Sequence, residues 1–445
     1  MKIKGEKFLV AGLGKTGAAL CRFLVRAGAE VAATEARPRE EVPECEEMEN
    51  LGVKVEAGGH TEKTFASAGT VILSPGVPPG IAPLRAARRE GASVTGEAEF
   101  AFRLSRLPVV AVTGSNGKTT TTALTASILR RCGRRVFVGG NFGDPYINSV
   151  GRESEYDIAL LEMSSFQLKT TSSFSPLIAV LLNISPNHLD VHPTYADYAN
   201  SKKKIFANQT PEQWAVVNGA DSEALSAARN SRSQKVIFDS SLSAPAPGVV
   251  TASGARVFCG GQTYDLSGAK FEGKHNMENA MAAIAVSSIL GCPSGEAAAA
   301  AREFSPPPHR MEFVREVSGA RVYDDSKATN PAATAKALDS LKPPVVLISG
   351  GRDKKTGYSV LRSPVESKVS SLVLFGESRD AMFAELGGLA KTVLTESLEQ
   401  AVASAVENSR PGGSILFSPA CSSFDMFSSF EERGREFQRI VKSFG

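Results

Sequence analysis

Short apolar runs rich in β-branched residues alternate with stretches rich in alanine and leucine along most of this chain. The short runs are typical of buried strands and the longer stretches of helices. Their alternation is the pattern of an α/β fold with mainly parallel sheets, and we therefore predict that fold class. The predicted strands are residues 8–11, 71–73, 109–113, 158–162, 178–182, 345–349, 372–375 and 415–417.

Two places interrupt this alternation and look like joints between domains. At residues 107–108 a charged helical stretch gives way to a new strand, and at residues 305–308 three consecutive prolines stop an alanine-rich helix. We therefore expect three domains, which we place at residues 1–100, 101–304 and 305–445. Residues 231–270 are rich in Ser, Gly and Ala and are expected to form peripheral strands and turns.

The composition agrees with several globular domains. A chain of 445 residues is too long for one compact core. With 42% hydrophobic and 22% charged residues it can bury substantial apolar surface, which excludes a globally disordered or fibrous protein. The 50 Lys and Arg against 47 Asp and Glu leave a net charge of +3, too small to indicate a nucleic-acid-binding or membrane-surface protein. Any anionic ligand must therefore be bound by a local cluster of positively charged groups.

Cysteine usage and the absence of apolar segments bear on the compartment. The six cysteines are scattered without a CxxC pair, so we expect free thiols. The first residues enter a predicted strand instead of an apolar signal segment, and no apolar run of about eighteen residues could cross a bilayer. We expect a cytoplasmic protein without membrane insertion.

The strongest local pattern is a strand, a glycine loop and a helix. The apolar run 109–113 precedes Gly-Ser-Asn-Gly-Lys-Thr-Thr at 114–120, and a helical stretch follows as far as Gly133. In this arrangement backbone N–H groups and the positive helix end cradle phosphates, Lys118 reaches the outer phosphates, and Thr119 can bind magnesium. Val112 stands where the usual P-loop has its first glycine, so the loop is shorter than the common one. The pattern predicts nucleotide binding.

Further polar residues follow the next predicted strands. Glu162 ends the run 158–162, where its carboxylate would point toward the phosphate loop and hold magnesium; a solvated strand-end carboxylate is the alternative. The segment 187–192 carries two of the five histidines, which fit either a site or packing residues. The lysines at 202–204 look like the exposed basic face of a helix.

The motifs TGSNGKTT, EMSSFQ, NHLDVH, GKHNMENA, PPHRME, DDSKATNP, GGRDKK and SPACSSFD follow one another as in the Mur ligase family, which the chain resembles from Gly12 nearly to its end. TGSNGKT is shared with folylpolyglutamate synthases, whereas DSKATNP with SPACSSFD is similar to the D-glutamate-adding members. The resemblance implies an N-terminal Rossmann-like domain for the UDP end of the substrate, a central P-loop-type ATPase domain with a parallel sheet, and a C-terminal Rossmann-like domain for the amino acid.

The resemblance also implies a reaction. ATP activates the carboxylate of UDP-N-acetylmuramoyl-L-alanine as an acyl phosphate, and the amine of D-glutamate then attacks the activated carbonyl. The task of the protein is mostly alignment and charge neutralisation. The chain lacks the DNPR-type arginine motif of the diaminopimelate- or lysine-adding members. The family further implies a cytoplasmic monomer.

The glycine loop near the N-terminus has two interpretations. Gly12, Gly14 and Gly17 between a strand and a helix, with Glu35 about twenty residues further on, formally fit a dinucleotide site. The resemblance instead assigns this loop to the uridine and its phosphates. The UDP-substrate residues that it implies are Gly14, Thr16, Glu35, Arg37, Ser74, Gly76 and Asn141.

For the nucleotide and two magnesium ions, the resemblance assigns roles to residues around the phosphate loop. Thr119 and Glu162 match ligands of the first ion and His188 a ligand of the second. Lys202 matches a lysine that becomes carbamylated and also holds the second ion; Lys203 and Lys204 leave a one-position error open. The implied nucleotide-binding residues are Gly114, Ser115, Asn116, Gly117, Lys118, Thr119, Thr120, Asn276, Asn279, Arg310 and Asp325.

For D-glutamate, the resemblance implies a binding pocket in the C-terminal domain. Phe424 is bulkier than the aliphatic residue that this position can carry, which puts the shape of the pocket in doubt, and Lys355 stands next to the assigned Lys354. The implied residues are Lys327, Thr329, Lys354, Ser423, Phe424 and Phe430.

Three other functions compete with this interpretation. A folylpolyglutamate synthase or another amide ligase of the same superfamily shares the phosphate loop. A catalytically silent nucleotide-binding scaffold is disfavoured because Lys118, Glu162 and His188 are intact. An NAD-dependent dehydrogenase would leave the phosphate loop without a use.

Overall fold

Every apolar run that the sequence predicts as a strand is a strand in the computed structural model, which describes residues 2–189, 191–270, 273–355 and 357–444. Only the strand ends differ, as where the run 178–182 stops one residue earlier. These strands are β1 (Lys7–Ala11), β4 (Thr70–Leu73), β6 (Val109–Thr113), β8 (Ile158–Glu162), β9 (Ile178–Leu181), β17 (Val345–Gly350), β18 (Val369–Phe375) and β20 (Ser414–Phe417).

The N-terminal part is a five-stranded parallel sheet of order β3-β2-β1-β4-β5. Alternate residues of β1 point to opposite faces, so Phe8 and Val10 pack in one apolar cluster with α1, while Leu9 and Ala11 pack in another with α3 and α4. The remaining elements are β2 (Glu30–Glu35), β3 (Lys54–Ala57), β5 (Ser93–Gly96), α1 (Lys15–Arg26), α2 (Glu44–Asn50), α3 (Glu62–Ala66) and α4 (Pro83–Arg89).

The central part is a nine-stranded sheet of order β14-β13-β12-β11-β10-β9-β6-β8-β7. Its core strands are parallel, whereas β12, β13 and β14 form an antiparallel edge. The peripheral strands predicted for residues 231–270 are thus present, but their antiparallel pairing was not predicted. These strands are β7 (Val136–Gly140), β10 (Trp214–Asn218), β11 (Gln234–Asp239), β12 (Val249–Ser253), β13 (Arg256–Cys259) and β14 (Gln262–Asp265). The helices are α6 (Lys118–Arg131), α7 (Ser165–Lys169), α8 (Tyr195–Lys203), α9 (Ser222–Arg229), α10 (Lys274–Ile289) and α11 (Ser294–Glu303).

The C-terminal part is a six-stranded sheet of order β15-β16-β20-β17-β18-β19, parallel except for the edge strand β15. The three α/β sheets confirm the predicted fold class. The remaining elements are β15 (Glu312–Val317), β16 (Ala320–Asp324), β19 (Lys391–Leu394), α12 (Pro331–Asp339), α13 (Arg362–Lys368), α14 (Arg379–Leu386), α15 (Leu398–Asn408) and α16 (Phe430–Ser443).

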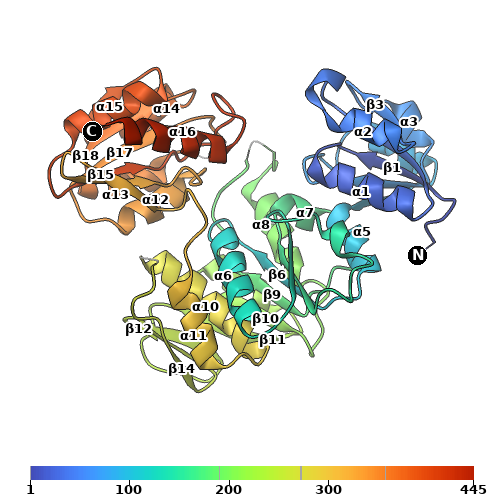
Figure 1. Cartoon of the computed structure of the whole chain (residues 1–445), viewed down its shortest axis with the longest axis horizontal. Coiled ribbons are helices and arrows are strands. Elements are labelled where there is room, and N and C mark those ends of the chain that lie inside the picture. The colour runs from blue at the N-terminus through green and yellow to red at the C-terminus, as the bar shows by residue number, and fades with distance from the viewer. Residues whose placement is uncertain (1, 190, 271–272, 356, 445) are drawn as a thin grey trace.

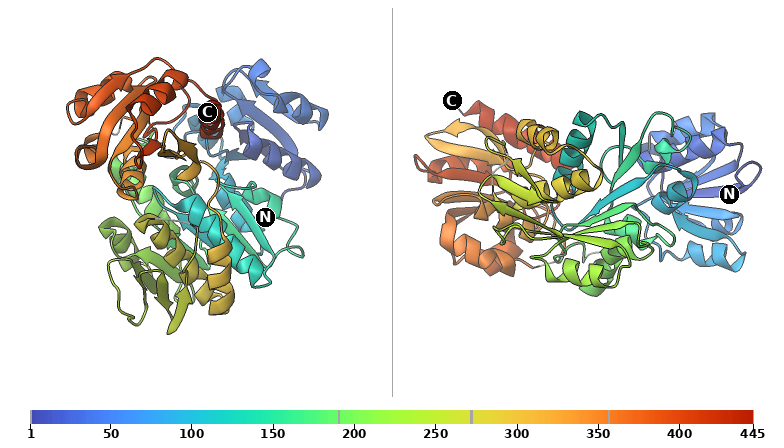
Figure 2. Two further views of the ribbon diagram at one scale, coloured as in Figure 1. Left: turned by 60° about the vertical axis from the view of Figure 1, so that its left-hand side comes forward. Right: turned by 90° about the horizontal axis from the view of Figure 1, so that it is seen from below.

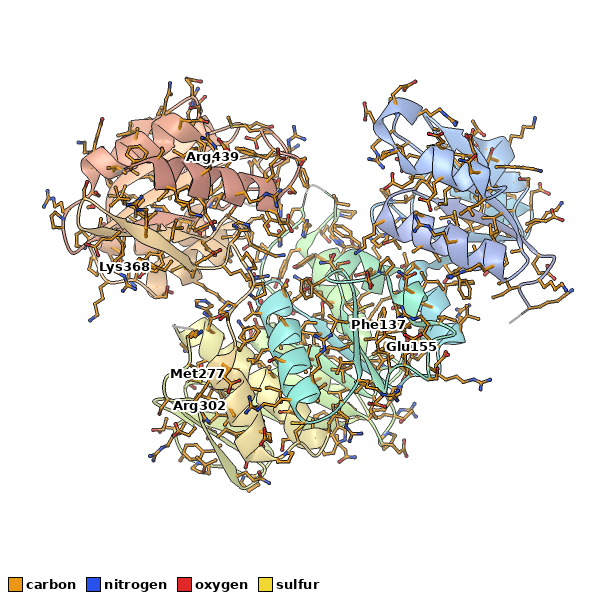
Figure 3. All side chains as sticks on the ribbon, in the orientation of Figure 1. Phe137, Glu155, Met277, Arg302, Lys368 and Arg439 are labelled. Carbon is orange, nitrogen blue, oxygen red and sulfur yellow. The ribbon has the colours of Figure 1, made fainter. Side chains whose placement is uncertain are left out.

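The central part lies between the other two. Figure 1 shows the blue N-terminal part and the red C-terminal part on opposite sides of it, and the views in Figure 2 agree. With side chains drawn, Arg439 of α16 lies on the outside of the C-terminal part, and Met277 and Arg302 lie on two helices of the central part (Figure 3). Among the helices of the described residues, none combines the length and the apolar character that a membrane span requires.

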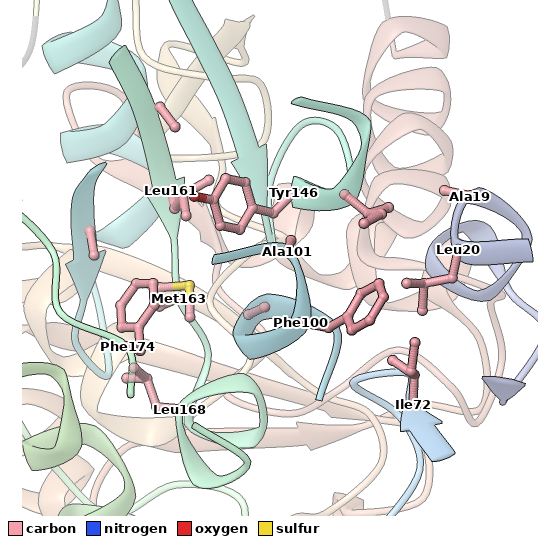
Figure 4. Packing of buried hydrophobic residues seen from close by; sticks show 14 of the residues in the cluster. Ala19, Leu20, Ile72, Phe100, Ala101, Tyr146, Leu161, Met163, Leu168 and Phe174 are labelled. Carbon is pink, nitrogen blue, oxygen red and sulfur yellow. The ribbon is translucent and has the colours of Figure 1, made fainter. Parts of the chain in front are cut away.

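Helix α5 (Glu97–Leu104) joins the first two sheets. It packs with the short helix η2 (Tyr146–Ser149), and Phe100, Leu20, Tyr146 and Leu161 share one buried cluster across the joint (Figure 4). We call this contact the seam: α5, η2 and Thr170. A Cβ on Gly96 would lie 2.0 Å from Thr170 Oγ1, so the approach requires glycine. The boundary predicted at residue 100 falls inside α5, and the domain limits stay a prediction.

Candidate active site

A cavity of about 1210 Å³ lies where the three parts meet. The N-terminal part contributes the segment after β4, the central part contributes its phosphate loop and strand ends, and the C-terminal part contributes segments after β16 and β20. Most of the predicted site residues line it. They are Ser74, Gly76, Ser115, Asn116, Gly117, Lys118, Thr119, Thr120, Asn141, Glu162, His188, Lys202, Asn276, Asn279, Arg310, Asp325, Lys327, Thr329, Lys354, Ser423, Phe424 and Phe430.

The remaining predicted substrate residues lie at the carboxyl edge of the N-terminal sheet, outside the lining of this cavity: Gly14, Thr16, Glu35 and Arg37. Glu35 accepts hydrogen bonds from the backbone N–H of Leu13 at 2.8 Å and from the Arg37 side chain at 3.1 Å. Burial, the largest single influence, raises the pKa of Glu35, but these hydrogen bonds outweigh it and lower the pKa to about 2. Glu35 therefore holds the glycine loop as an ionised carboxylate. Ser74 Oγ donates to Gly12 O at 2.7 Å and links this loop to the cavity wall.

The phosphate loop follows β6 and opens α6, as predicted. Gly117 has a φ of 84°, and a Cβ there would lie 2.3 Å from Asn279 Oδ1, so this position requires glycine. Asn183 holds the loop by accepting the Asn116 N–H at 2.9 Å. Lys118 folds back, and its Nζ donates to the carbonyl oxygens of Gly114 and Ser115 at 3.1 and 3.3 Å. The loop keeps its own lysine beside the place where phosphates would lie.

Four residues that line the cavity have a buried polar atom without a hydrogen-bond partner among the described residues: Glu97 Oε2, Glu162 Oε2, Arg310 Nε and Asn116 Nδ2. Glu162 uses its other oxygen to accept from Asn141 Nδ2 at 2.7 Å. Leaving a buried donor or acceptor unpaired costs roughly 1–3 kcal/mol. An anion beside Arg310 and a cation beside Glu162 would remove that cost, which is the donor set that a magnesium nucleotide needs.

The three consecutive lysines point in different directions. Lys202 is only 2% exposed, and its Nζ donates to Gly114 O at 2.8 Å. Burial, followed by the charge of Lys118, lowers the pKa of Lys202 well below its ordinary value. Lys203 pairs with Glu223 at 2.7 Å, and Lys204 donates to the Lys169 carbonyl. The prediction that the three lysines form an exposed basic face was therefore wrong for Lys202, because the last turn of this helix packs against the phosphate loop.

The two histidines of residues 187–192 differ in burial and in contacts, because His192 is buried and His188 is half-buried. His188 lines the cavity with a φ of 55°, a left-handed conformation that costs energy for a non-glycine residue. Burial, followed by the charges of Lys354 and Lys118, lowers the pKa of His188 to about 2, so the imidazole is neutral and can bind a metal. His192 lies 2.6 Å from Asp197 Oδ2 and 3.0 Å from Ser165 Oγ. Asp190 between them lies outside the described residues.

The C-terminal part supplies a second set of charged groups. Burial raises the pKa of Asp325 to about 7, although Ser418 Oγ donates to its carboxylate at 2.8 Å. Burial likewise lowers the pKa of Lys327 to about 8, and its Nζ lies 4.0 Å from the centre of the Phe430 ring. Lys354 Nζ donates to Thr329 Oγ1 at 3.2 Å. Phe424 lines the cavity with 62% of its surface exposed, so this bulky side chain stands at the rim.

Several contacts at the cavity were not predicted. Asn330 Nδ2 donates to Asn116 Oδ1 at 3.1 Å and bridges the C-terminal and central parts. The buried guanidinium of Arg433 donates to the backbone carbonyls of Ser326, Cys421 and Ser422. The Asn-Pro pair at 330–331 signals the start of a helix, but it does not indicate the contact of Asn330 with Asn116. No local signal points to the contacts of Arg433, because its partners are distant in the sequence.

Three family descriptions match consecutive parts of the chain: the Mur ligase MurD-like N-terminal domain at residues 6–96, the Mur ligase middle domain at 112–287, and the Mur ligase glutamate ligase domain at 309–421. Two relatives named UDP-N-acetylmuramoylalanine--D-glutamate ligase, from Geotalea uraniireducens and Geobacter metallireducens, are 42% and 43% identical to this chain. Both alignments cover 100% of it, and 98% and 99% of the relatives. This chain belongs to the Mur ligase family.

Solved structures support the Mur ligase fold over the whole chain. A pseudomurein peptide ligase type C from Methanothermus fervidus aligns with a TM-score of 0.64 at 17% identity and covers 99% of this chain and 100% of its own. MurF from Acinetobacter baumannii aligns with a TM-score of 0.63 at 19% identity and covers 98% and 91%. At such identities these likenesses support the three-domain Mur ligase fold alone.

Proposed function

We propose that this chain joins the carboxylate of UDP-N-acetylmuramoyl-L-alanine to the amine of D-glutamate in an ATP-dependent reaction that passes through an acyl phosphate. The product belongs to peptidoglycan precursor synthesis. The full-length identity of 42–43% to two ligases that carry this substrate pair in their name supports the proposal. One observation carries it on the structural side: a single cavity is lined by the phosphate loop and by the residues that the family uses for the amino acid.

The residues of the chain align and neutralise the reactants. Lys118 and Arg310 offer positive charge to the phosphates, and the unpartnered Nε of Arg310 is a donor ready for an oxygen. Lys327, Lys354 and Ser423 of the C-terminal part line the same cavity, where they would bind the carboxylates of D-glutamate. Closure of the C-terminal part over the cavity would exclude water, which would otherwise hydrolyse an acyl phosphate.

Magnesium fits the donor set on the central wall. Glu162 offers a buried oxygen without a partner, and Thr119 and the neutral His188 line the same cavity. Thr119 and Glu162 would hold one ion, and His188 with Lys202 a second. When bound, the ions would supply positive charge that offsets the negative charge of the transferring phosphoryl group.

Lys202 would reach the second ion only after modification, because an ammonium repels magnesium. Its amine is buried beside the phosphate loop, and burial favours the neutral form that can react with carbon dioxide. The carbamate would be an anion with oxygen donors. Lys203 donates to Glu223 and Lys204 to the Lys169 carbonyl. These contacts support Lys202, and not a neighbouring lysine, as the carbamylated residue.

An acceptor test decides the function. ADP formation should require both UDP-N-acetylmuramoyl-L-alanine and D-glutamate, with L-glutamate much poorer. Turnover of a folate with L-glutamate would favour the folylpolyglutamate synthase alternative, and binding of ATP without any turnover would favour a scaffold. An NAD titration tests the dehydrogenase. Sedimentation and cell fractionation test the expected cytoplasmic monomer.

The Lys202 carbamate has its own test. Lys202→Ala should be severely impaired and partly restored by acetate, because a short carboxylate can occupy the vacated space. Lys203→Ala and Lys204→Ala are the matched controls and should be much milder, and acetate should not stimulate the wild type. Near-normal activity of Lys202→Ala with loss in Lys203→Ala would show that the register is wrong, and activity in all three would rule out the carbamate.

A further inference from the structure

Helix α5 carries two buried carboxyl groups that have different partners. Glu99 accepts hydrogen bonds from Arg103 Nε at 2.8 Å and from the backbone N–H groups of Ser172, Ser173 and Phe174 at 3.0 to 3.1 Å. Glu97 is only 2% exposed, and its Oε1 accepts the Ile147 N–H at 2.8 Å. Its Oε2 is buried without a partner among the described residues. Packing at the seam explains Glu99 but leaves half of the Glu97 carboxyl unexplained.

Glu97 also differs from Glu99 in its location: Glu97 lines the cavity, whereas Glu99 is not among the lining residues. It is the first residue of α5 and follows β5 directly, so it stands at the carboxyl edge of the parallel N-terminal sheet, where α/β proteins bind their ligands. Ser74 and Asn141, two predicted substrate residues, line the same cavity. The unpartnered carboxyl oxygen therefore belongs to a residue that lines the same cavity as the predicted UDP-substrate residues Ser74 and Asn141 and the phosphate loop.

The surroundings of Glu97 favour its neutral form. Burial raises the pKa of Glu97 to about 7, and the backbone N–H groups of Ile147 and Tyr146 only partly oppose this. The titratable groups on the elements packed around it are Tyr146 on η2, Lys169 on α7, which is bonded to Asp197, and the paired Glu99 and Arg103 on α5 itself. Because Oε1 accepts the Ile147 N–H, the proton of the neutral acid is expected on Oε2. Among the described residues, this buried O–H group then has no acceptor.

We propose that Glu97 is a substrate-binding residue whose Oε2 hydroxyl donates a hydrogen bond to an acceptor oxygen of the muramoyl-alanine part of the UDP substrate. This inference rests on the proposed function, which supplies the substrate. It explains why a carboxyl group without a cationic partner is kept at the cavity wall, where an apolar side chain would otherwise be more stable. Bound substrate would satisfy the remaining oxygen.

Direct binding of UDP-N-acetylmuramoyl-L-alanine, measured by calorimetry without ATP, tests this role. At pH 6 Glu97→Ala should bind roughly three- to tenfold more weakly than the wild type, as expected for one lost hydrogen bond. Glu97→Gln keeps an N–H donor and a carbonyl acceptor, so it should bind within about twofold of the wild type. The matched control is Ser149→Ala on η2: the Ser149 hydroxyl is also buried without a partner but does not line the cavity, and its loss should leave the affinity unchanged.

A pH series separates the donor role from a merely structural one. Between pH 6 and 8.5 the wild type should lose affinity as the carboxyl ionises, whereas Glu97→Gln should lose less, and the difference between the two reports Glu97 alone. Wild-type affinity in Glu97→Ala, equal weakening in Glu97→Gln and Glu97→Ala, or identical pH profiles for wild type and Glu97→Gln would each overturn the proposal. If Glu97→Ala does not fold, the pH profiles decide. No binding by the wild type would instead count against the proposed function.

Discussion

The seam between the N-terminal and central parts is apolar and continuous, whereas the contact between the central and C-terminal parts is polar. Phe8 of the first sheet and Ala111 of the central sheet belong to one buried cluster. Among the described residues, no buried apolar cluster combines residues of the central and C-terminal sheets, and Asn330 reaches Asn116 across the cavity instead. Apolar burial holds surfaces together at all times, whereas a polar, ligand-lined contact gains most of its stability when the ligand is bound.

Because of this difference, we expect the C-terminal part to move relative to the other two parts. The glycine loop after β1, which is predicted to bind the UDP end, is fixed relative to the phosphate loop through α5, η2 and the contact of Lys15 with the Gly143 carbonyl at 2.7 Å. Among the described residues, the segments of the C-terminal part that would carry the amino acid share no buried apolar cluster with the central part. We expect binding of the UDP substrate to be independent of the nucleotide and binding of D-glutamate to require closure.

The largest expected effect tests the independence of the first two sites. Lys118→Ala should lower turnover by about a hundredfold or more, as for loss of a group that stabilises charge in the transition state. The affinity for the UDP substrate should stay within a few-fold, because all of its predicted residues except Asn141 lie in the N-terminal part. Steady-state ADP formation and calorimetry measure the two quantities. An equal loss of UDP-substrate affinity in a folded variant would contradict this division.

Breaking the seam should destabilise two parts at once. Phe100 is buried between Phe8 and Phe23, with ring centres 5.8 and 6.4 Å away, so Phe100→Ala should lower the free energy of unfolding by about 3–5 kcal/mol. Hydrogen exchange should show the loss in both the N-terminal and the central sheet. Phe417→Ala is the control, since Phe417 stacks on Phe437 inside the C-terminal part. A loss confined to the N-terminal sheet in Phe100→Ala would mean that the seam is not a shared core.

Closure around the polar contact should be visible without loss of stability. Small-angle scattering with an ATP analogue and UDP substrate should show compaction caused by the C-terminal part, with residues 305–311 as the joint, where no helix or strand is present. The distance between labels on α1 and α6 should stay constant. An unchanged scattering profile in a sample shown to be fully liganded would speak against closure.

The smallest effect concerns the bridge from Asn330. Asn330→Ser keeps a capping oxygen for α12 but is too short to reach Asn116. It should cost at most about 1 kcal/mol of unfolding free energy, and it should shift the scattering profile toward the open form before ligand is added. Asn330→Ala, which also removes the cap, should cost more stability. Equal stability of the two variants would show that the cap contributes nothing.

The sequence predicted the strands because buried parallel strands are nearly continuous apolar runs, and residues 109–113 match β6 at both ends. It predicted the phosphate loop because strand, glycines and lysine are contiguous. Periodicity could not choose among Lys202, Lys203 and Lys204, because the choice depends on how α8 packs. Nor could it find Glu97, whose environment is formed by backbone groups some fifty residues away. The roles of the individual site residues stay predictions.

The hydrogen bonds of the Arg433 guanidinium limit which side chain can replace it. Its guanidinium makes four hydrogen bonds, all to oxygen atoms of Ser326, Cys421 and Ser422. Two irregular segments, one carrying Lys327 and the other Ser423, are thereby cross-linked by a single side chain. A lysine has three donors on one nitrogen and cannot match a planar fork that spans both segments. A swap that conserves charge would thus leave carbonyl groups unpaired, and arginine is the only one of the two basic residues that fits this position.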